Sequence, residues 1–394
     1  MTRRSRFFDL VLIACFLVGL LFPLLVIRGH STSVTEKRTL APSPSWPASA
    51  EELMTFPSTF ENWFNDHFGG RHRLVQAYHL MALALGSSGT PRVLVGRKGW
   101  LYYTDSNDGN NMEDYRRTDP LTPQELERWR LVLETKASWL KSQGIAYLFI
   151  VVPNKHTIYP EYYPSRIRVR GVRSRLDQFM DAMHGSDVPV MDLREPLRQA
   201  KIFGPLYHRT DSHWNALGAA LAGNLILEKL GSLDPGTHGR RFGVDDFSWH
   251  AMPGGDLARM LSLSSLLREV RVPVIRPGRL RCAPQAPEQV LDAEDPDLVI
   301  TTCRSEGKSA VVFRDSFFTA LRPLFSEHFT RTVYTTALPE IDTLEQFVRR
   351  YAPDVVVEER VERYLKVLPK APDLSSEPYR ALLDARRPRA LNVP

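Results

Sequence analysis

The sequence predicts an α/β fold built on a parallel sheet. From about residue 93 onward, short apolar runs alternate with segments of helical periodicity, and this alternation is typical of a parallel sheet with helices on both faces. The composition, 43% hydrophobic and 24% charged, is that of an ordinary globular protein. At 394 residues the chain exceeds one average domain, so we expect an N-terminal extension ahead of the α/β domain.

The N-terminal extension begins with a predicted membrane anchor. Three arginines lie within the first nine residues, and an apolar run from Leu10 to Ile27 follows them. That run is about long enough to cross a bilayer, and its basic flank should stay in the cytoplasm. A cleaved signal peptide is the alternative, but no small-x-small cleavage pattern follows the run. We therefore expect a cytoplasmic stub at 1–9, a transmembrane anchor at 10–27 and an extracytoplasmic body.

Residues 28–92 are expected to form a linker and a helical segment. The stretch 31–50 is rich in Ser, Thr and Pro, which is typical of a linker. From Glu51 to Leu85 apolar residues recur at helical spacing, with a break at Gly69-Gly70. The aromatic residues of this segment are predicted to be packing surface.

The α/β domain is expected at 93–365. Thr122 and Glu125 form a predicted capping box with Pro123 at the first helical position. The fully apolar run 145–152 indicates a strand covered on both faces. The expected helices are 123–144, 172–184, 216–230, 317–325 and 343–351, and the expected strands are 145–152, 188–193, 309–314, 332–336 and 354–359. Residues 234–304 are predicted to be loop-rich, and residues 366–394 a loose C-terminal tail.

The charge distribution gives no sign of a nucleic-acid partner. The net charge is +6, but no basic stripe interleaved with aromatics is present, so we expect no nucleic-acid partner.

The three cysteines fall in two parts of the chain. Cys15 lies in the predicted anchor. Cys282 and Cys303 could form one disulfide in an oxidising compartment, and two buried free thiols are an equally good interpretation.

Ser316 is the candidate nucleophile. It follows the predicted strand 309–314 and precedes a predicted helix, and ligands of open parallel sheets bind beyond the carboxyl ends of strands. Backbone N–H groups at the helix start could face a developing oxyanion. The alternative is that Asp315 and Ser316 merely cap the helix.

Asp211 and His213 supply the partners that a serine nucleophile needs. Histidine is the usual base because its pKa lies near neutrality, and Asp211 could orient the imidazole through its other ring nitrogen. One alternative is a plain loop in which both residues have structural roles. Another is a metal site formed with His208, although no further Cys/His cluster completes a ligand shell, so we expect no metal.

The ordered motifs resemble a known family. Asp211-x-His213-Trp214-Asn215 and the later Asp315-Ser316-Phe317 look like those of alginate O-acetyltransferase and related SGNH-like proteins of bacterial exopolysaccharide acetylation. The resemblance spans about residues 55–365. Further matching segments are 65–68 with Arg71, 98–102, 153–155, 159–161, Gly255-Asp256-Leu257 and 356–360.

The resemblance implies an SGNH-hydrolase-like domain in which the Asp-x-His pair precedes the serine block. Ser316 would be the acetylated nucleophile, His213 the general base and Asp211 its orienter. A glycine common in the family is replaced by Arg314, so the Ser316 N–H becomes the best oxyanion donor. Lys155, Arg314 and Trp214 are expected to face substrate, with a solvated surface position as the alternative for Lys155 and a core position as the alternative for Trp214.

The function expected from this resemblance is extracytoplasmic O-acetyl transfer to an exopolysaccharide hydroxyl, without a cofactor. The partners would be the polysaccharide, the bacterial inner membrane and a polytopic membrane acyltransferase that supplies acetyl groups to the periplasm. An esterase or deacetylase with the same three residues is the nearest alternative. A non-catalytic polysaccharide-assembly protein is the second. The sequence does not identify the polymer, the acetylated hydroxyl or the oligomeric state.

Overall fold

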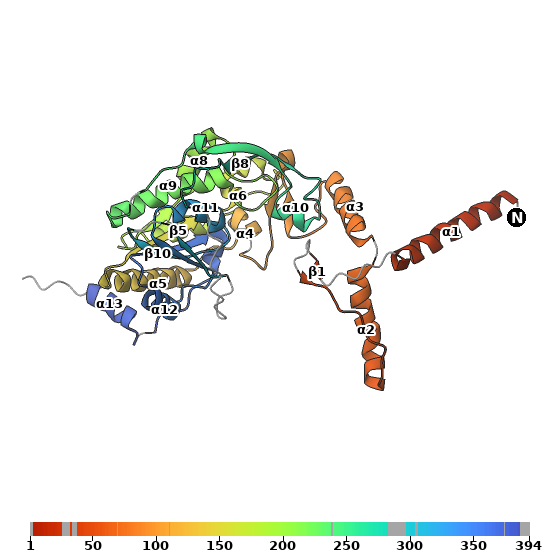
Figure 1. The fold of residues 1–394 in the computed structure, drawn as a ribbon, viewed down its shortest axis with the longest axis horizontal. Coiled ribbons are helices and arrows are strands. Elements are labelled where there is room, and N and C mark those ends of the chain that lie inside the picture. Colours follow the sequence, from red (N-terminus) through yellow and green to blue (C-terminus); the bar gives the residue numbers. More distant parts are fainter. Residues whose placement is uncertain are drawn as a thin grey trace, which may run out of the picture.

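The computed structural model shows an α/β body with a helical N-terminal extension. Helix α1 (Arg3–Leu25) and helix α2 (Ala50–His67) project away from the body, and α3 (Arg71–Ala84) lies nearer to it (Figure 1). The structure describes residues 3–25, 32–33, 38–68, 70–109, 111–237, 239–282, 297–303, 306–373 and 375–386.

The body is organised around a six-stranded sheet of order β6-β5-β12-β10-β11-β9. The strands are β5 (Ala146–Val152), β6 (Val190–Asp192), β9 (Val299–Thr302), β10 (Ser309–Phe313), β11 (Arg331–Thr335) and β12 (Val355–Val361). The predicted parallel pairing is confirmed for five strands, whereas β9 pairs antiparallel with β11. β9 is an edge strand, and an antiparallel edge strand is common on parallel sheets.

Alternate residues of the central strands pack against helices on opposite faces. In β5, Leu148 and Ile150 belong to one buried cluster, and Phe149 and Val151 belong to the other. This follows from the two-residue period of a strand and explains the unbroken apolar run. The first face is covered by α8 (Arg194–Ala200), α9 (Ala216–Leu233) and α11 (Phe318–Ser326), and the second by α5 (Pro123–Ser142), α7 (Arg175–Ala182) and α12 (Ile341–Tyr351).

Local signals in the sequence located most of these elements. The capping box is confirmed: Thr122 Oγ1 accepts from the Glu125 amide at 3.2 Å, and Glu125 Oε2 accepts from the Thr122 amide at 2.7 Å. The other predicted helices and strands of the body are present with bounds shifted by at most three residues. The predicted break in the N-terminal helical segment separates α2 from α3, where Gly70 has a φ of 82°.

Residues 234–304 contain more regular structure than predicted. The strands β7 (Phe247–Met252) and β8 (Glu269–Ile275) form an antiparallel pair that encloses α10 (Asp256–Met260), and β9 follows. Pro273 within β8 weakened the strand signal, because proline is tolerated only where no ladder hydrogen bond is needed. Cys282 and Cys303 form a disulfide at a Cα–Cα distance of 5.3 Å, which tethers the segment after β8 to the end of β9.

The remaining elements are short. They are β1 (Thr32–Ser33), β2 (Arg38–Thr39), β3 (Val93–Val95), β4 (Leu101–Tyr103), α4 (Asn111–Arg116), α6 (Lys155–Ile158) and the 3₁₀ helices 97–99, 160–162, 201–203, 244–246 and 362–366. β3 and β4 form an antiparallel hairpin that packs on α10.

Two helices, α1 and α9, are apolar enough to be compared with the predicted membrane anchor. Among the described residues, α9 alone is long and apolar enough to span a bilayer, and 44% of it is buried inside the body, as expected for a core helix. The apolar part of α1, Phe8–Gly19, is shorter and exposed. Residues 26–27 of the predicted anchor lie outside the described residues. The anchor therefore stays a prediction.

The predicted loose tail contains a packed helix. Helix α13 (Glu377–Arg386) lies along α5, and the Leu382 side chain is only 3% exposed. The prediction of a loose tail is wrong for this segment, because its few apolar residues are too sparse for a periodic signal and the packing partner is remote in sequence. Residues 387–394 lie outside the described part of the chain.

We expect Leu382→Ala to lower the free energy of unfolding by roughly 2–4 kcal/mol, because it opens a cavity between α13 and the body. Leu383→Ala is the matched control, since Leu383 is 43% exposed and its truncation should cost less than about 1 kcal/mol. Denaturant unfolding of both variants measures the difference. Equal effects would contradict the packed position of α13.

Candidate active site

Ser316 lies on a tight connection between β10 and α11. The Asp315 carboxylate fixes this connection by accepting from the Phe317 amide at 2.8 Å and from the Val361 amide at 2.7 Å. The Asp315 amide donates to Glu359 Oε2 at 2.9 Å. Asp315 therefore braces the turn before α11 and ties the connection to β12, but it is not the N-cap, which is Phe317. The exposed Ser316 hydroxyl is left available for another partner.

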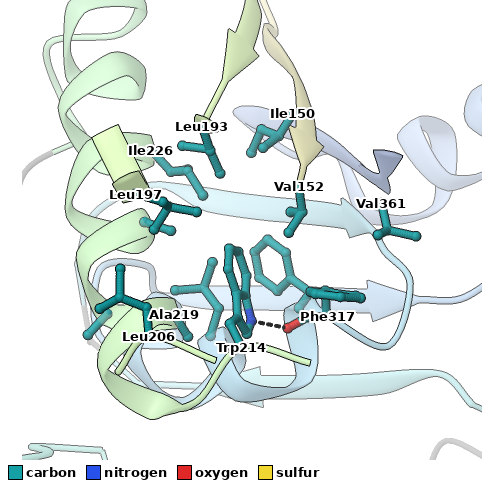
Figure 2. Packing of buried hydrophobic residues seen from close by; sticks show 14 of the residues in the cluster. Ile150, Val152, Leu193, Leu197, Leu206, Trp214, Ala219, Ile226, Phe317 and Val361 are labelled. Atoms are coloured by element: carbon teal, nitrogen blue, oxygen red, sulfur yellow. Dashed lines mark hydrogen bonds between the residues drawn. The ribbon is translucent and has the colours of Figure 1, made fainter. Parts of the chain in front are cut away.

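His213 is held opposite Ser316 by the residues that follow it. The indole Nε1 of Trp214 donates to the Phe317 carbonyl at 2.8 Å, and Figure 2 shows this bond within the packed core. Asn215 caps α9 by accepting from the amides of Leu217 and Gly218. The loop that carries His213 is thus joined to the connection that carries Ser316.

The structure brings the three predicted residues into one chain of contacts. His213 Nε2 lies 2.7 Å from Ser316 Oγ, and His213 Nδ1 lies 2.7 Å from Asp211 Oδ1. Because an ionised carboxylate can only accept, Nδ1 carries the proton and Nε2 of the neutral ring faces the hydroxyl. This arrangement can accept a proton from Ser316.

The Asp211 carboxylate is fixed by hydrogen bonds beyond its contact with the His213 ring. It also accepts from the amides of His213 and Asp256, at 3.0 and 2.7 Å. Burial raises the pKa of Asp211, but the hydrogen bond and charge of His213 outweigh that effect and hold the pKa well below its usual range. Burial lowers the pKa of His213, whereas the hydrogen bond to Asp211 and the nearby charges of Asp211 and Asp256 raise it, with a net upward shift.

The amide of Ser316 is the available oxyanion donor. It makes no hydrogen bond to any residue that the structure describes, so it can point at an oxygen near the hydroxyl. The amide of Arg314, in contrast, donates to the Thr335 carbonyl at 3.0 Å and belongs to the sheet. The Arg314 guanidinium lies beside the first turn of α11, with Nη1 3.2 Å from the Asp315 carbonyl and 3.3 Å from Thr319 Oγ1.

Comparison with known proteins assigns the chain to a family. Residues 93–306, more than half of the chain, match the family described as the SGNH hydrolase-like domain of the acetyltransferase AlgX. The chain belongs to this SGNH-like family. The sheet and flanking helices are the family's α/β fold, with the mixed pairing described above.

Two relatives and two solved structures show the range of similarity. The probable alginate O-acetylase AlgJ of Pseudomonas fluorescens is 27% identical over 54% of this chain and 52% of its own length. AlgJ of Azotobacter vinelandii is 23% identical over 80% of both chains. The match to AlgJ of Pseudomonas fluorescens therefore spans only about half of that relative's length.

Among solved structures, Bacillus cereus PatB1 with a sulfonyl adduct has a TM-score of 0.51 and 15% identity, and the match covers 71% of this chain and 97% of PatB1. The O-acetyltransferase domain of Pseudomonas putida AlgJ has a TM-score of 0.46 and 21% identity, over 75% of this chain and all of that domain. The PatB1 likeness supports the SGNH-like fold.

Lys155 does not occupy the solvated surface position given as its alternative, although it lines the small pocket beside the site. It is buried, and its ammonium donates to the carbonyls of Leu101, Arg209 and Asp211 at 2.6, 2.9 and 2.9 Å. These three acceptors use all three of its donors. Burial lowers the pKa of Lys155 to about 7, against the opposing charges of Asp211 and Glu269. Lys155 therefore fixes the loop that carries Asp211.

Trp214 also departs from the substrate-binding expectation. Its side chain is 1% exposed and packs with Phe317 at a ring-centroid distance of 5.8 Å (Figure 2). A buried indole cannot stack on a sugar, so the alternative core position is correct. The small pocket beside the site is lined instead by Tyr102, Tyr103, Asn111, Asn154, Lys155, His156, Ser212 and Arg363.

Asp256 is a site residue that the sequence did not single out. Its carboxylate accepts from the Ser212 amide at 2.7 Å and from the Ser212 hydroxyl, and it lies 3.5 Å from His213 Nδ1. Burial and then the charge of Asp211 raise its pKa. The only signal was the Gly255-Asp256-Leu257 motif, which had no role assigned, because the contact joins positions 44 residues apart.

The side chains that could hold a metal ion differ from the set considered from the sequence, which was His208, Asp211 and His213. Among the described residues around His213, the acidic and imidazole atoms that converge belong to Asp211, His213 and Asp256, and His208 is not among them. Both ring nitrogens of His213 already face Asp211 and Ser316. A cation bound by His213 would compete with one of these contacts.

We expect Gly255→Ala to slow the reaction of Ser316 with an activated acetyl ester by at least about tenfold. A Cβ atom at this position would overlap the Asp211 carboxylate, so Asp211 would shift and misplace His213. The backbone is not the obstacle, since the φ of −75° at Gly255 itself suits any L-residue. Gly243→Ala is the matched control, because no atom lies within 4 Å of its added Cβ. Unchanged reactivity in Gly255→Ala would contradict the close approach of Gly255 to the Asp211 carboxylate.

Proposed function

We propose that this protein is an extracytoplasmic O-acetyltransferase that carries an acetyl group on Ser316 and transfers it to a polysaccharide hydroxyl. The observation that carries the proposal is the contact of His213 Nε2 with the exposed Ser316 hydroxyl at 2.7 Å, while Asp211 holds the opposite ring nitrogen. Membership of the SGNH-like acetyltransferase family supports acetyl transfer as the chemistry.

The first half-reaction loads the serine. His213 Nε2 removes the hydroxyl proton while Ser316 Oγ attacks the carbonyl carbon of the acetyl donor. The negative charge that develops on the carbonyl oxygen faces the Ser316 amide. Collapse of the tetrahedral intermediate expels the donor's leaving group, which takes the proton from His213, and Ser316 is left as an acetyl ester.

The second half-reaction returns the enzyme to its starting state. His213, neutral again, removes the proton from a sugar hydroxyl that attacks the acetyl carbon. Ser316 Oγ leaves and regains its proton from His213. An esterase would follow the same steps with water as the attacking group, so both functions rest on the same residues. The relatives named alginate O-acetylase favour transfer.

Two structural features support an extracytoplasmic location. The disulfide between Cys282 and Cys303 suits an oxidising compartment. Helix α1 stands apart from the body and exposes an apolar surface (Figure 1), which suits a membrane anchor at 10–27 ahead of a catalytic domain at 93–365. Because acetyl-CoA is a cytoplasmic donor, a polytopic membrane acyltransferase of the inner membrane would supply the acetyl group.

Incubation of the full-length chain with an activated acetyl ester should add one acetyl group to Ser316, detectable by peptide mass spectrometry. Ser316→Ala should lose the adduct, and His213→Ala should slow its formation by about 10³-fold or more because the hydroxyl stays protonated. An oligosaccharide acceptor should then receive the label. Acetate release with no acetylated sugar would favour the esterase, and absence of the adduct would favour the non-catalytic alternative.

The pH dependence of acetyl-ester turnover should report the raised pKa of His213. The base must be neutral, so the rate should rise as pH increases through that pKa. Asp211→Asn removes a charge that raises the pKa of His213. The acidic limb of the pH–rate profile should therefore move to lower pH, while the maximal rate falls by about 10²- to 10⁴-fold. A limb that stays in place, or moves to higher pH, would contradict the assigned role of Asp211.

A further inference from the structure

Glu359 is a buried acid beneath the nucleophile that the two half-reactions do not use. It lies on β12 and is 1% exposed, and its Oε2 accepts from the Asp315 amide at 2.9 Å. Its other oxygen, Oε1, is buried, and no donor among the described residues lies within hydrogen-bond distance of it. An ionised Glu359 would therefore lack the partners that stabilise a buried charge.

The preceding residue of β12, Glu358, has the partners that Glu359 lacks. Glu358 Oε2 accepts from the Lys136 ammonium and from the Tyr147 hydroxyl, both at 2.8 Å. Arg360 Nε lies 3.5 Å from Glu358 Oε1. The two acids are adjacent in sequence and equally buried, but among the described residues only Glu358 contacts a cation.

The carboxyl group of Asp315 faces the side chain of Glu359. A side-chain hydrogen bond joins the two carboxyl groups, and such a bond needs a proton on one of them. Both oxygens of Asp315 already accept from amides, those of Phe317 and Val361, at 2.8 and 2.7 Å. Glu359 has one oxygen without a donor. The proton is therefore assigned to Glu359 Oε1.

The surroundings of Glu359 favour its neutral form. Burial raises the pKa of Glu359 well above its usual value, and the charge of Asp315 and the hydrogen bond to its carboxyl group act in the same direction. The hydrogen bond from the Asp315 amide and the charge of Arg314 act in the opposite direction and do not outweigh the rise. Two contacting acids in a dry site cannot both ionise at low cost.

The other ionisable groups near Glu359 supply no counter-charge. Burial raises the pKa of Tyr207 well above its usual value, and the charge of Glu359 adds to this effect, so Tyr207 is neutral. Its hydroxyl donates to the Pro153 carbonyl at 2.6 Å. The cation Arg363 lies 3.5 Å from Asp108.

We propose that Glu359 is a neutral acid that positions Ser316, because its Oε1 hydroxyl donates to the Asp315 carboxylate while its Oε2 accepts from the Asp315 amide. These two bonds hold the residue directly before Ser316 and keep the hydroxyl opposite His213. Glu359 acts through Asp315 and is a positioning residue, and its effect on the reaction rests on the acetyl transfer proposed above. A glutamine would present the same donor and acceptor pair without a proton to lose.

The stability of Glu359→Gln relative to the wild-type protein tests the protonation state. In the unfolded chain Glu359 ionises near the ordinary pKa of about 4.3, whereas in the folded protein it stays neutral to higher pH. The stability that this proton gives the wild-type protein is therefore lost as pH rises from the ordinary pKa toward the folded-state pKa. Glutamine cannot ionise, so the thermal midpoint of Glu359→Gln should rise relative to the wild-type protein by roughly 5 °C or more between about pH 5 and about pH 8.

Glu358→Gln is the matched control, because it makes the same chemical change at the adjacent buried position. It removes the counter-charge of the Lys136 ammonium, and breaking a buried ion pair is strongly destabilising. We expect its thermal midpoint to lie below that of the wild-type protein throughout the same pH range. The two glutamine variants should thus differ in sign at about pH 8.

The rate at which an activated acetyl ester loads Ser316 tests the positioning role. Glu359→Ala should lower this rate by about tenfold or more, because the Asp315 amide and carboxylate both lose their partner and the nucleophile moves relative to His213. Glu359→Gln should restore the rate to within about threefold of the wild-type value. The rates are compared at a temperature where thermal unfolding shows every variant to be folded.

Two outcomes would overturn the proposal. One is a midpoint difference between Glu359→Gln and the wild-type protein that stays constant or falls with rising pH, as an ionised Glu359 with Arg314 as its counter-charge would give. The other is a Glu359→Gln variant that loads Ser316 no faster than Glu359→Ala. Failure of the proposed acetyl transfer is recognised separately, since the wild-type chain would then form no Ser316 adduct while the stability difference remained.

Discussion

A buried hydrogen bond from the Trp214 indole to the Phe317 carbonyl joins two loops that lie 103 residues apart in sequence. One loop carries Asp211 and His213, and the other carries Ser316. A single such bond contributes only about 1 kcal/mol net, but an unpaired indole N–H in this core would cost about 1–3 kcal/mol. Because Trp214 also packs between α9 and the sheet, the loops cannot separate without opening the core. The spacing of His213 and Ser316 therefore depends on core packing as much as on polar contacts at the surface.

The fold and the three central site residues could be predicted because their signals are local. The capping box at Thr122, the apolar run of β5 and the placement of Ser316 at a strand end each involve neighbouring residues. The roles of Lys155, Trp214 and Asp256 could not be predicted, because each depends on contacts with residues at least 44 positions away. A buried lysine that satisfies three carbonyls looks identical in sequence to a solvated one. Helix α13 was missed for the same reason, since its packing partner α5 lies near the start of the domain.

Several buried acids surround the site, and their pKa values are shifted in opposite directions by burial and by neighbouring groups. Asp211 stays ionised because His213 and backbone amides surround it. Glu359, beneath the Ser316 connection, has its pKa raised well above its usual value by burial and by the charge of Asp315. Burial and Asp114 raise the pKa of Glu362 to about 7. The charge of Asp211 therefore lies directly behind the imidazole, where it raises the pKa of His213.

The exposed position of Ser316 has a consequence for efficiency. A hydroxyl open to solvent can be reached by a long polymer without threading, but an acetyl ester formed there is equally open to water. Under the acetyl transfer proposed above, productive use of each acetyl group would depend on how long an acceptor chain stays bound relative to the hydrolytic lifetime of the ester. An enzyme whose nucleophile is this exposed would work best on a polymer held at high local concentration, and poorly on dilute, short chains.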